Sequence, residues 1–194
     1  MKLEPQRTAI LSLDVQNDLV ETTPGVRDGG MLQRMASIVA TGRAAGATII
    51  HITASVRPDF RDIPKDNPLW ITIRKQRSMI FGTKGAEVHE SVAPREDELV
   101  INKTCVDPFL TTNLGQALIN ADVNTLVLFG LWTNYVVEAT ARHASDMGYR
   151  VFIVSDCCAS NDVDNHNWAM ERILPTLSYI ATTDEIVSAL QARS

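Results

Sequence analysis

The sequence predicts an α/β protein with a three-layer α/β/α fold around a doubly wound, mostly parallel sheet of six strands. Short apolar segments alternate with longer amphipathic segments along the chain, as in successive βαβ units. The apolar segments lack the strict alternation of half-exposed strands, which is typical of a sheet with helices on both faces. The length of 194 residues, 45% of them hydrophobic, suits a single domain that spans residues 1–194.

Each predicted strand is a short apolar segment that ends at a polar residue or a glycine. In chain order the strands are TAILSLDV (8–15), TIIHITAS (48–55), ELVINK (98–103), TLVLFG (125–130), RVFIVSD (150–156) and YIAT (179–182). Helices are predicted at 31–46, 113–122, 136–148 and 166–174, and a last one follows residue 182. Gly46 and Pro175 are suitable stops for two of them, and Thr182 with Glu185 forms a capping box for the last.

Residues 56–97 interrupt the regular alternation of strands and helices. This segment contains Pro58, Pro64, Pro68 and Pro94, and the stretch PLWITIRKQR (68–77) within it predicts a short helix. Long connections inside compact domains usually serve as lids, binding loops or subunit contacts. We therefore expect a lid or an oligomer contact here.

Composition and charge exclude several classes of function. The chain has 18 basic and 23 acidic residues without a basic run, which disfavours nucleic acid and anionic membranes as partners. The first ten residues lack the apolar core of a signal peptide, and no segment approaches the roughly 20 apolar residues of a membrane span. Cys105, Cys157 and Cys158 are an odd number with an adjacent pair, which is unlike a disulfide framework. These features predict a cytoplasmic protein.

Two charged residues end predicted strands, at the sheet edge where ligands bind in doubly wound folds. Asp14 ends the first strand and Lys103 ends the third. Taken alone, Asp14 suits a loop cap, and Lys103 suits a side chain that reaches the surface. A phosphatase-type site would have a second aspartate at the position of Gln16, so we set that alternative aside. Together, the two charges predict an ion pair at the floor of a pocket.

The segment GLWTNYVVEAT (130–140) is a third strand end, which turns directly into a predicted helix. The N-terminus of a helix offers free N–H groups that can stabilise an oxyanion, and a thiol placed there would be acidified. The residue near the start of this helix is Val136, an aliphatic side chain that cannot attack a substrate. An ordinary βα turn with Val136 as a packing residue explains the same sequence.

The order of these segments resembles that of the isochorismatase-like hydrolases, also called the cysteine hydrolase superfamily. The resemblance runs through TAILSLDVQNDLV, GTKGAEVHESVAP, KTCVDPFLTTNL and GLWTNYVVEATARHASDMGYRVFIVSDCCAS, and it covers nearly the whole chain. The family includes nicotinamidases, N-carbamoylsarcosine amidase and ureide-type amidohydrolases. The resemblance implies that this protein acts on a small-molecule substrate and forms a homodimer or homotetramer.

The family triad of Asp, Lys and Cys corresponds to Asp14, Lys103 and Val136, so the nucleophilic thiol is missing. True isochorismatases also lack this cysteine and use the aspartate as an acid on a vinyl ether, with glycine at the position of Val136. The resemblance also implies a non-proline cis peptide between Leu131 and Trp132. It places further residues around the substrate pocket or the oxyanion: Leu19, Phe109, Leu131, Trp132 and Tyr135. Among these, Leu19 replaces a usual aromatic residue, and Trp132 replaces a smaller one.

No metal or other cofactor is expected. Nicotinamidases hold a metal with an Asp and closely spaced histidines, whereas the four histidines here are scattered. Our leading hypothesis is a hydrolase without a thiol, with Asp14 as general acid or base and Lys103 as its charge partner. Two alternatives stay open: a catalytically silent relative that binds a ligand or partner, and an amidase that uses a displaced cysteine, Cys105 or Cys157.

Overall fold

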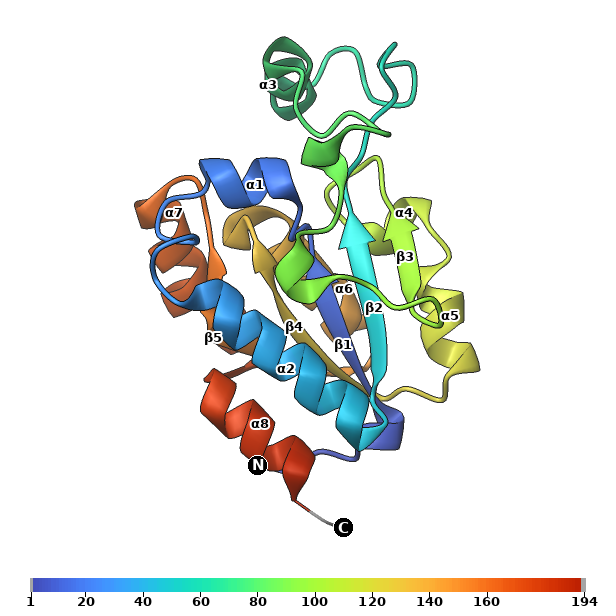
Figure 1. Ribbon diagram of the computed structural model, residues 1–194, viewed down its shortest axis with the longest axis vertical. Helices are drawn as coiled ribbons and strands as arrows, with labels where there is room; N and C mark the ends of the chain where they lie inside the picture. Colours follow the sequence, from blue (N-terminus) through green and yellow to red (C-terminus); the bar gives the residue numbers. More distant parts are fainter. Residues whose placement is uncertain (1, 193–194) are drawn as a thin grey trace.

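The computed structural model describes residues 2–192 and contains a six-stranded sheet in the order β3-β2-β1-β4-β5-β6 (Figure 1). Every pairing between neighbouring strands is parallel, so the predicted fold class is confirmed. The strands are β1 (Thr8–Leu13), β2 (Thr48–Thr53), β3 (Leu99–Asn102), β4 (Thr125–Leu131), β5 (Arg150–Ala159) and β6 (Tyr179–Ala181).

Helices enclose the central strands on both faces. The α-helices are α1 (Asn17–Thr22), α2 (Met31–Ala45), α3 (Pro68–Gln76), α4 (Pro108–Thr111), α5 (Leu114–Asn120), α6 (Glu138–Asp146), α7 (Val163–Trp168) and α8 (Thr183–Gln191). Helices α2 and α8 pack against each other in front of the sheet, and α6 lies behind the strands in this view (Figure 1). The capping box of Thr182 and Glu185 is present at the start of α8, as predicted.

The edge strands are less covered than we expected from their apolar sequences. In β3 the side chains of Leu99 and Val100 are 46% and 50% exposed, and Tyr179 in β6 is 60% exposed. By contrast, every residue of β1 and β4 is buried. The prediction of two covered faces is therefore correct for the central strands and wrong for the edges, because the helices are centred over the middle of the sheet.

Strand β5 continues three residues beyond its predicted end and includes both adjacent cysteines. Its pairing with β4 shifts register between Leu128 and Gly130, where Ile153 faces the first and Cys158 faces the second. This irregularity lets the strand continue through the polar residues Ser155 and Asp156, which the sequence suggested as its end. Cys157 and Cys158 are thus buried in the sheet instead of following it.

The long connection between β2 and β3 carries α3, which lies beyond the carboxyl ends of the strands, at the top of Figure 1. The side chain of Asn67 caps this helix by accepting a hydrogen bond from Leu69 N–H at 3.1 Å. Pro68 occupies the first turn, where it needs no hydrogen-bond donor, and Arg77 ends the helix with a left-handed φ of 51°. The short helix predicted within 68–77 is confirmed.

Glu98 ties the end of this connection to the body of the protein. Its carboxylate accepts hydrogen bonds from Arg43 Nε at 2.6 Å and Nη2 at 2.8 Å, and from the Arg95 N–H at 2.9 Å; His51 Nε2 lies 3.1 Å away. Burial raises the pKa of Glu98, but these hydrogen bonds outweigh it and lower the pKa from 4.5 to about 2.

We expect Glu98→Gln to lower the free energy of unfolding by about 2 kcal/mol at neutral pH, because charge-assisted hydrogen bonds are lost. Since the folded-state pKa of Glu98 is depressed, its contribution is present above pH 4.5 and disappears as the pH falls towards about 2. The difference between variant and wild type should therefore shrink in acid. Urea denaturation at several pH values measures it, with the exposed Glu96→Gln as control. Equal stability of Glu98→Gln and wild type at neutral pH would contradict this role.

Candidate active site

The carboxyl ends of β1 and β3 bring Asp14 and Lys103 together, as the sequence predicts. The two strands flank β2, and each charged residue directly follows its strand. Lys103 Nζ lies 2.8 Å from Asp14 Oδ2, and the two residues are only 3% and 5% exposed. The sheet thus holds a buried ion pair at the edge where doubly wound folds bind ligands.

Backbone hydrogen bonds to β2 fix both members of the pair. The Asp14 N–H donates to the Ile52 carbonyl at 2.9 Å, and the Lys103 N–H donates to the Thr53 carbonyl at 2.8 Å. Asp14 also adopts a left-handed φ of 53°, which is uncommon for a residue with a side chain. The chain therefore turns sharply at Asp14, while the backbone hydrogen bonds to β2 fix the position of Asp14 relative to Lys103.

The Asp14 carboxyl has one paired and one unpaired oxygen. Its Oδ2 accepts the hydrogen bond from Lys103, whereas its Oδ1 is buried and has no hydrogen-bond partner among the residues that the structure describes. Burial raises the pKa of Asp14, and this effect exceeds the lowering by the charge and hydrogen bond of Lys103. A carboxyl group with a raised pKa and a free oxygen is suited to proton transfer.

A small, mostly apolar cavity of about 30 Å³ lies over the ion pair. Besides Asp14 and Lys103, it is lined by five residues that we singled out from the sequence: Leu19, Cys105, Trp132, Tyr135 and Val136. Two others are not in its lining. Phe109 stacks on His143 with ring centroids 4.6 Å apart, and Leu131 is fully buried within β4.

Sequence reasoning missed the residues that close this cavity. Leu69, Trp70 and Ile73 reach it from α3, and Met79 follows that helix. Trp70, Ile73 and Met79 are each less than 5% exposed. The stretch PLWITIRKQR (68–77) predicted a short helix, but only the path of the connection reveals what the buried side chains of this helix cover.

The turn after β4 differs from the expectation in two ways. The described residues contain no cis peptide bond, so the expectation of a cis peptide between Leu131 and Trp132 is wrong. Instead, Trp132 makes the bend with a left-handed φ of 70°. The helix begins with a π-helical turn at Thr133–Val137, three residues before its predicted start. Gly130 allows this bend, since its φ is 151° and a Cβ atom there would lie 2.0 Å from the Leu13 carbonyl oxygen.

Val136 is 1% exposed and lines the cavity together with the ion pair. The position that the sequence resemblance aligns with a nucleophilic cysteine therefore borders the same space as Asp14 and Lys103. Because it is aliphatic, the cavity lacks a thiol at this point.

The three cysteines differ in their access to this cavity. Cys105 lines it, and its Sγ donates a hydrogen bond to the Asp107 carbonyl at 2.9 Å. Burial raises the pKa of Cys157 to about 11, and it raises the pKa of Cys158 as well. Thiols with raised pKa values are poor nucleophiles at neutral pH, which argues against both residues of β5.

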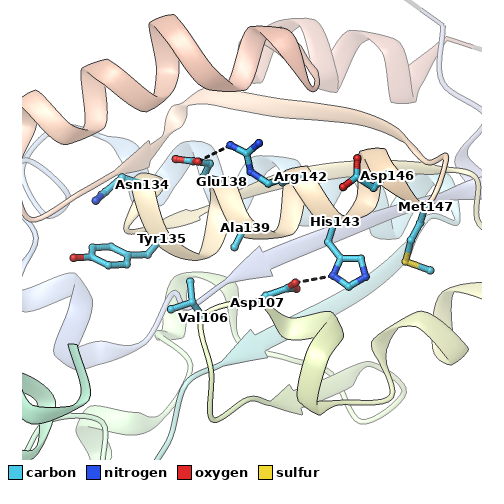
Figure 2. A pocket seen from close by; sticks show the side chains of 10 residues that line it. All are labelled: Val106, Asp107, Asn134, Tyr135, Glu138, Ala139, Arg142, His143, Asp146 and Met147. Carbon is cyan, nitrogen blue, oxygen red and sulfur yellow. Dashed lines mark hydrogen bonds and ion pairs between the residues drawn. The ribbon is translucent and has the colours of Figure 1, made fainter. Parts of the chain in front are cut away.

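A wider hollow of about 540 Å³ lies along α6 and shares Val106 and Tyr135 with the small cavity (Figure 2). Two polar contacts occupy it: Asp107 Oδ2 lies 2.6 Å from His143 Nδ1, and Glu138 and Arg142 form an ion pair at 2.9 Å (Figure 2). Because these side chains already have partners at an open surface, we place the candidate active site at the cavity over Asp14 and Lys103.

The described residues, 2–192, hold no cluster of three or more His, Cys, Asp and Glu side chains that could bind a metal ion. None of the helices in this range has the length and apolar character to cross a membrane.

Comparison with known proteins places this site in a family context. Residues 8–185 match the family model described as Isochorismatase domain. The chain is 32% identical over 156 residues to streptothricin hydrolase of Streptomyces noursei, covering 80% of this chain and half of that relative. It is 28% identical over 169 residues to maleamate amidohydrolase of Pseudomonas putida, covering 83% of this chain and 76% of the relative. Among solved structures, a cysteine hydrolase from Pseudomonas syringae pv. phaseolicola superposes with a TM-score of 0.88 at 24% identity, covering 98% and 95% of the two chains.

Proposed function

Because this chain belongs to the isochorismatase family, we propose that it is a small-molecule hydrolase that works without a thiol nucleophile. The observation that carries the proposal is the buried pair of Asp14 and Lys103, 2.8 Å apart beneath a cavity bordered by Val136. Two of the three triad positions keep their chemistry, whereas the covalent route through the third is closed.

In this proposal Asp14 is the group that moves protons. Lys103 holds Oδ2 in place, which leaves Oδ1 for a water molecule or a substrate atom. The protonated carboxyl group donates a proton to a vinyl ether, whereas the ionised form removes one from an attacking water. The raised pKa of Asp14 favours the acid role, which needs the protonated form.

The turn between β4 and α6 supplies the proposed oxyanion site. The Tyr135 N–H already donates to the Trp132 carbonyl at 2.9 Å, so this amide is occupied. The other N–H groups in the first turn of the helix are suited to stabilise negative charge on a substrate oxygen.

Turnover of a panel of vinyl ethers, amides and ureides by the purified protein tests this function. We expect Asp14→Asn to lower kcat/KM for an accepted compound by at least about 100-fold, because the acid–base group is lost. For a vinyl ether, wild-type kcat/KM should fall as the pH rises through the elevated pKa of Asp14, since the protonated form is consumed.

The exposed Asp146→Asn in the wider hollow serves as the matched control and should retain activity. Undiminished turnover by Asp14→Asn would show that the proposed role of this residue is wrong.

The loss of the thiol at position 136 also favours a second candidate, a catalytically silent protein that binds a small molecule or a partner. Such a protein would keep the cavity and its ion pair without forming product. Ligands that raise the melting temperature but are recovered unchanged would support this alternative, and product formation that depends on Asp14 would exclude it.

A further inference from the structure

The indole N–H of Trp132 is a buried donor without an acceptor. Its Nε1 atom is shielded from solvent and makes no hydrogen bond to any residue in the described part of the chain. Buried tryptophan N–H groups normally find a partner, and the exceptions often mark sites that await a ligand or an ordered water. A purely structural tryptophan would gain nothing from this arrangement.

The turn around Trp132 holds the indole in a fixed place. The Trp132 N–H donates to the Ala159 carbonyl at 2.8 Å, and the Trp132 carbonyl accepts from the Tyr135 N–H at 2.9 Å. The next side chain, Thr133, is fully buried and its Oγ1 lies 2.8 Å from His166 Nδ1. The left-handed φ of Trp132 is thus supported on both sides, as expected of a preorganised binding group.

Trp132 also stands between two hollows. Together with Leu19 it lines the small cavity over the ion pair, and both residues line an outer cleft of about 540 Å³. The lining of the outer cleft includes the polar and charged residues Asp18, Thr72 and Arg77. The indole of Trp132 therefore belongs to a residue that borders both the outer cleft and the cavity over Asp14.

The chemistry of the small cavity limits what can accept the indole hydrogen. Its walls are mostly aliphatic and aromatic, and its two charged groups, Asp14 and Lys103, already neutralise each other. Two residues that line the cavity each carry a buried atom without a hydrogen-bond partner among the described residues: the oxygen Oδ1 of Asp14 and the donor Nε1 of Trp132. A carboxylate would lie against Asp14 without a further cation in the cavity lining, which disfavours anionic ligands.

We infer that Trp132 is a specificity-determining residue whose indole N–H binds the oxygen of an uncharged acyl compound, such as a small neutral amide. The opposite side of that compound faces Asp14 Oδ1. The inference rests on the proposed function for the identity of the cavity, and it names the substrate class that this cavity selects.

The test uses heteronuclear NMR of the full-length protein with isotopically labelled tryptophan. The chain has three indole N–H groups, at Trp70, Trp132 and Trp168. The Trp132 signal is assigned by its absence in Trp132→Phe, which keeps an aromatic ring and removes the donor. Propionamide and propionate are titrated as probes, since they share a shape and differ in charge.

We expect propionamide to shift the Trp132 indole signal and to leave the exposed Trp168 signal in place. Its Kd should rise about three- to tenfold in Trp132→Phe, the usual effect of one lost hydrogen bond, and stay unchanged in Trp168→Phe. At a pH where Asp14 is ionised and paired with Lys103, propionate should bind at least about tenfold more weakly than propionamide to the wild type, because it would desolvate a second anion beside Asp14. An unmoved Trp132 signal, equal affinity in Trp132→Phe, or equal binding of propionate would each overturn the inference.

These readouts separate the inference from the proposed function. If propionamide shifts the Trp132 signal and no compound in the panel is hydrolysed, the binding role stands and the catalytic proposal falls. If the enzyme turns over anionic substrates as well as uncharged ones, with equal dependence on Asp14, the catalytic proposal stands and the inferred selectivity falls.

Discussion

The Lys103→Ala variant is expected to lose about 3–5 kcal/mol of unfolding free energy at neutral pH, because it leaves the buried carboxylate of Asp14 without its partner. In the wild type, Lys103 Nζ and Asp14 Oδ2 are 2.8 Å apart, and both side chains are less than a tenth exposed. Removing either charge alone leaves the other desolvated and unpaired. Urea denaturation monitored by circular dichroism measures the loss, and the exposed Lys75→Ala serves as control.

The sign of the pH dependence follows from the burial of Asp14. Burial already raises the pKa of this carboxyl group in the wild type, and removal of Lys103 raises it further. A raised folded-state pKa contributes stability below the unfolded-state value and loses it as the pH rises through the folded-state value. The loss of unfolding free energy in Lys103→Ala relative to wild type should therefore be smallest in acid and grow towards neutral pH.

A double-mutant cycle separates the ion pair from the packing of its side chains. The double variant Asp14→Asn, Lys103→Met replaces both charges with neutral groups of similar size. It should be more stable than the sum of the single losses predicts, since no unpaired charge remains. If Lys103→Ala lowers the unfolding free energy by less than about 1 kcal/mol, as substitutions at exposed sites do, the ion pair is exposed to water and our prediction is wrong.

The pairing of Asp14 with Lys103 was predictable because the parallel topology places all carboxyl strand ends at one edge. Apolar runs and their spacing were enough to locate six strands and the order of helices. Two charged residues at ends of strands that flank a common neighbour must then lie close together. The proximity of the two charges follows from the course of the strands and does not depend on side-chain geometry.

Features that depend on backbone geometry or on distant contacts were not predictable. The bend at Trp132 and the early π-helical turn follow Gly130, whose backbone packs closely against Leu13. Strand β5 extends through Ser155 and Asp156 because of an irregular pairing with β4, which no local preference for strand residues indicates. The closure of the cavity by α3 depends on the path of a long connection, and the sequence shows only that the helix has an apolar face.

The most informative substitution is Val136→Cys, which places a thiol at the position that we propose to correspond to the nucleophile of the family. Valine and cysteine differ little in volume, so the fold should be retained at a cost of less than about 1.5 kcal/mol. The new thiol would border the same cavity as Lys103, close to the first turn of the helix that leads into α6. A nearby ammonium and a helix N-terminus both lower the pKa of a thiol, which raises its reactivity at neutral pH.

We therefore expect Val136→Cys to gain measurable amidase or esterase activity, and to react with iodoacetamide at least about tenfold faster than Val137→Cys. Val137 is the matched control, because it is fully buried in the same turn but does not line the cavity. The wild type supplies the background from its own three cysteines. Adding Asp14→Asn to Val136→Cys should remove the gained activity, since the thiol then lacks its proton acceptor.

A folded Val136→Cys protein that neither hydrolyses acyl substrates nor reacts faster than its control would mean that the cavity has diverged in more than the missing sulfur. In that case the closed, apolar lining contributed by α3 would be the first part of the site to change.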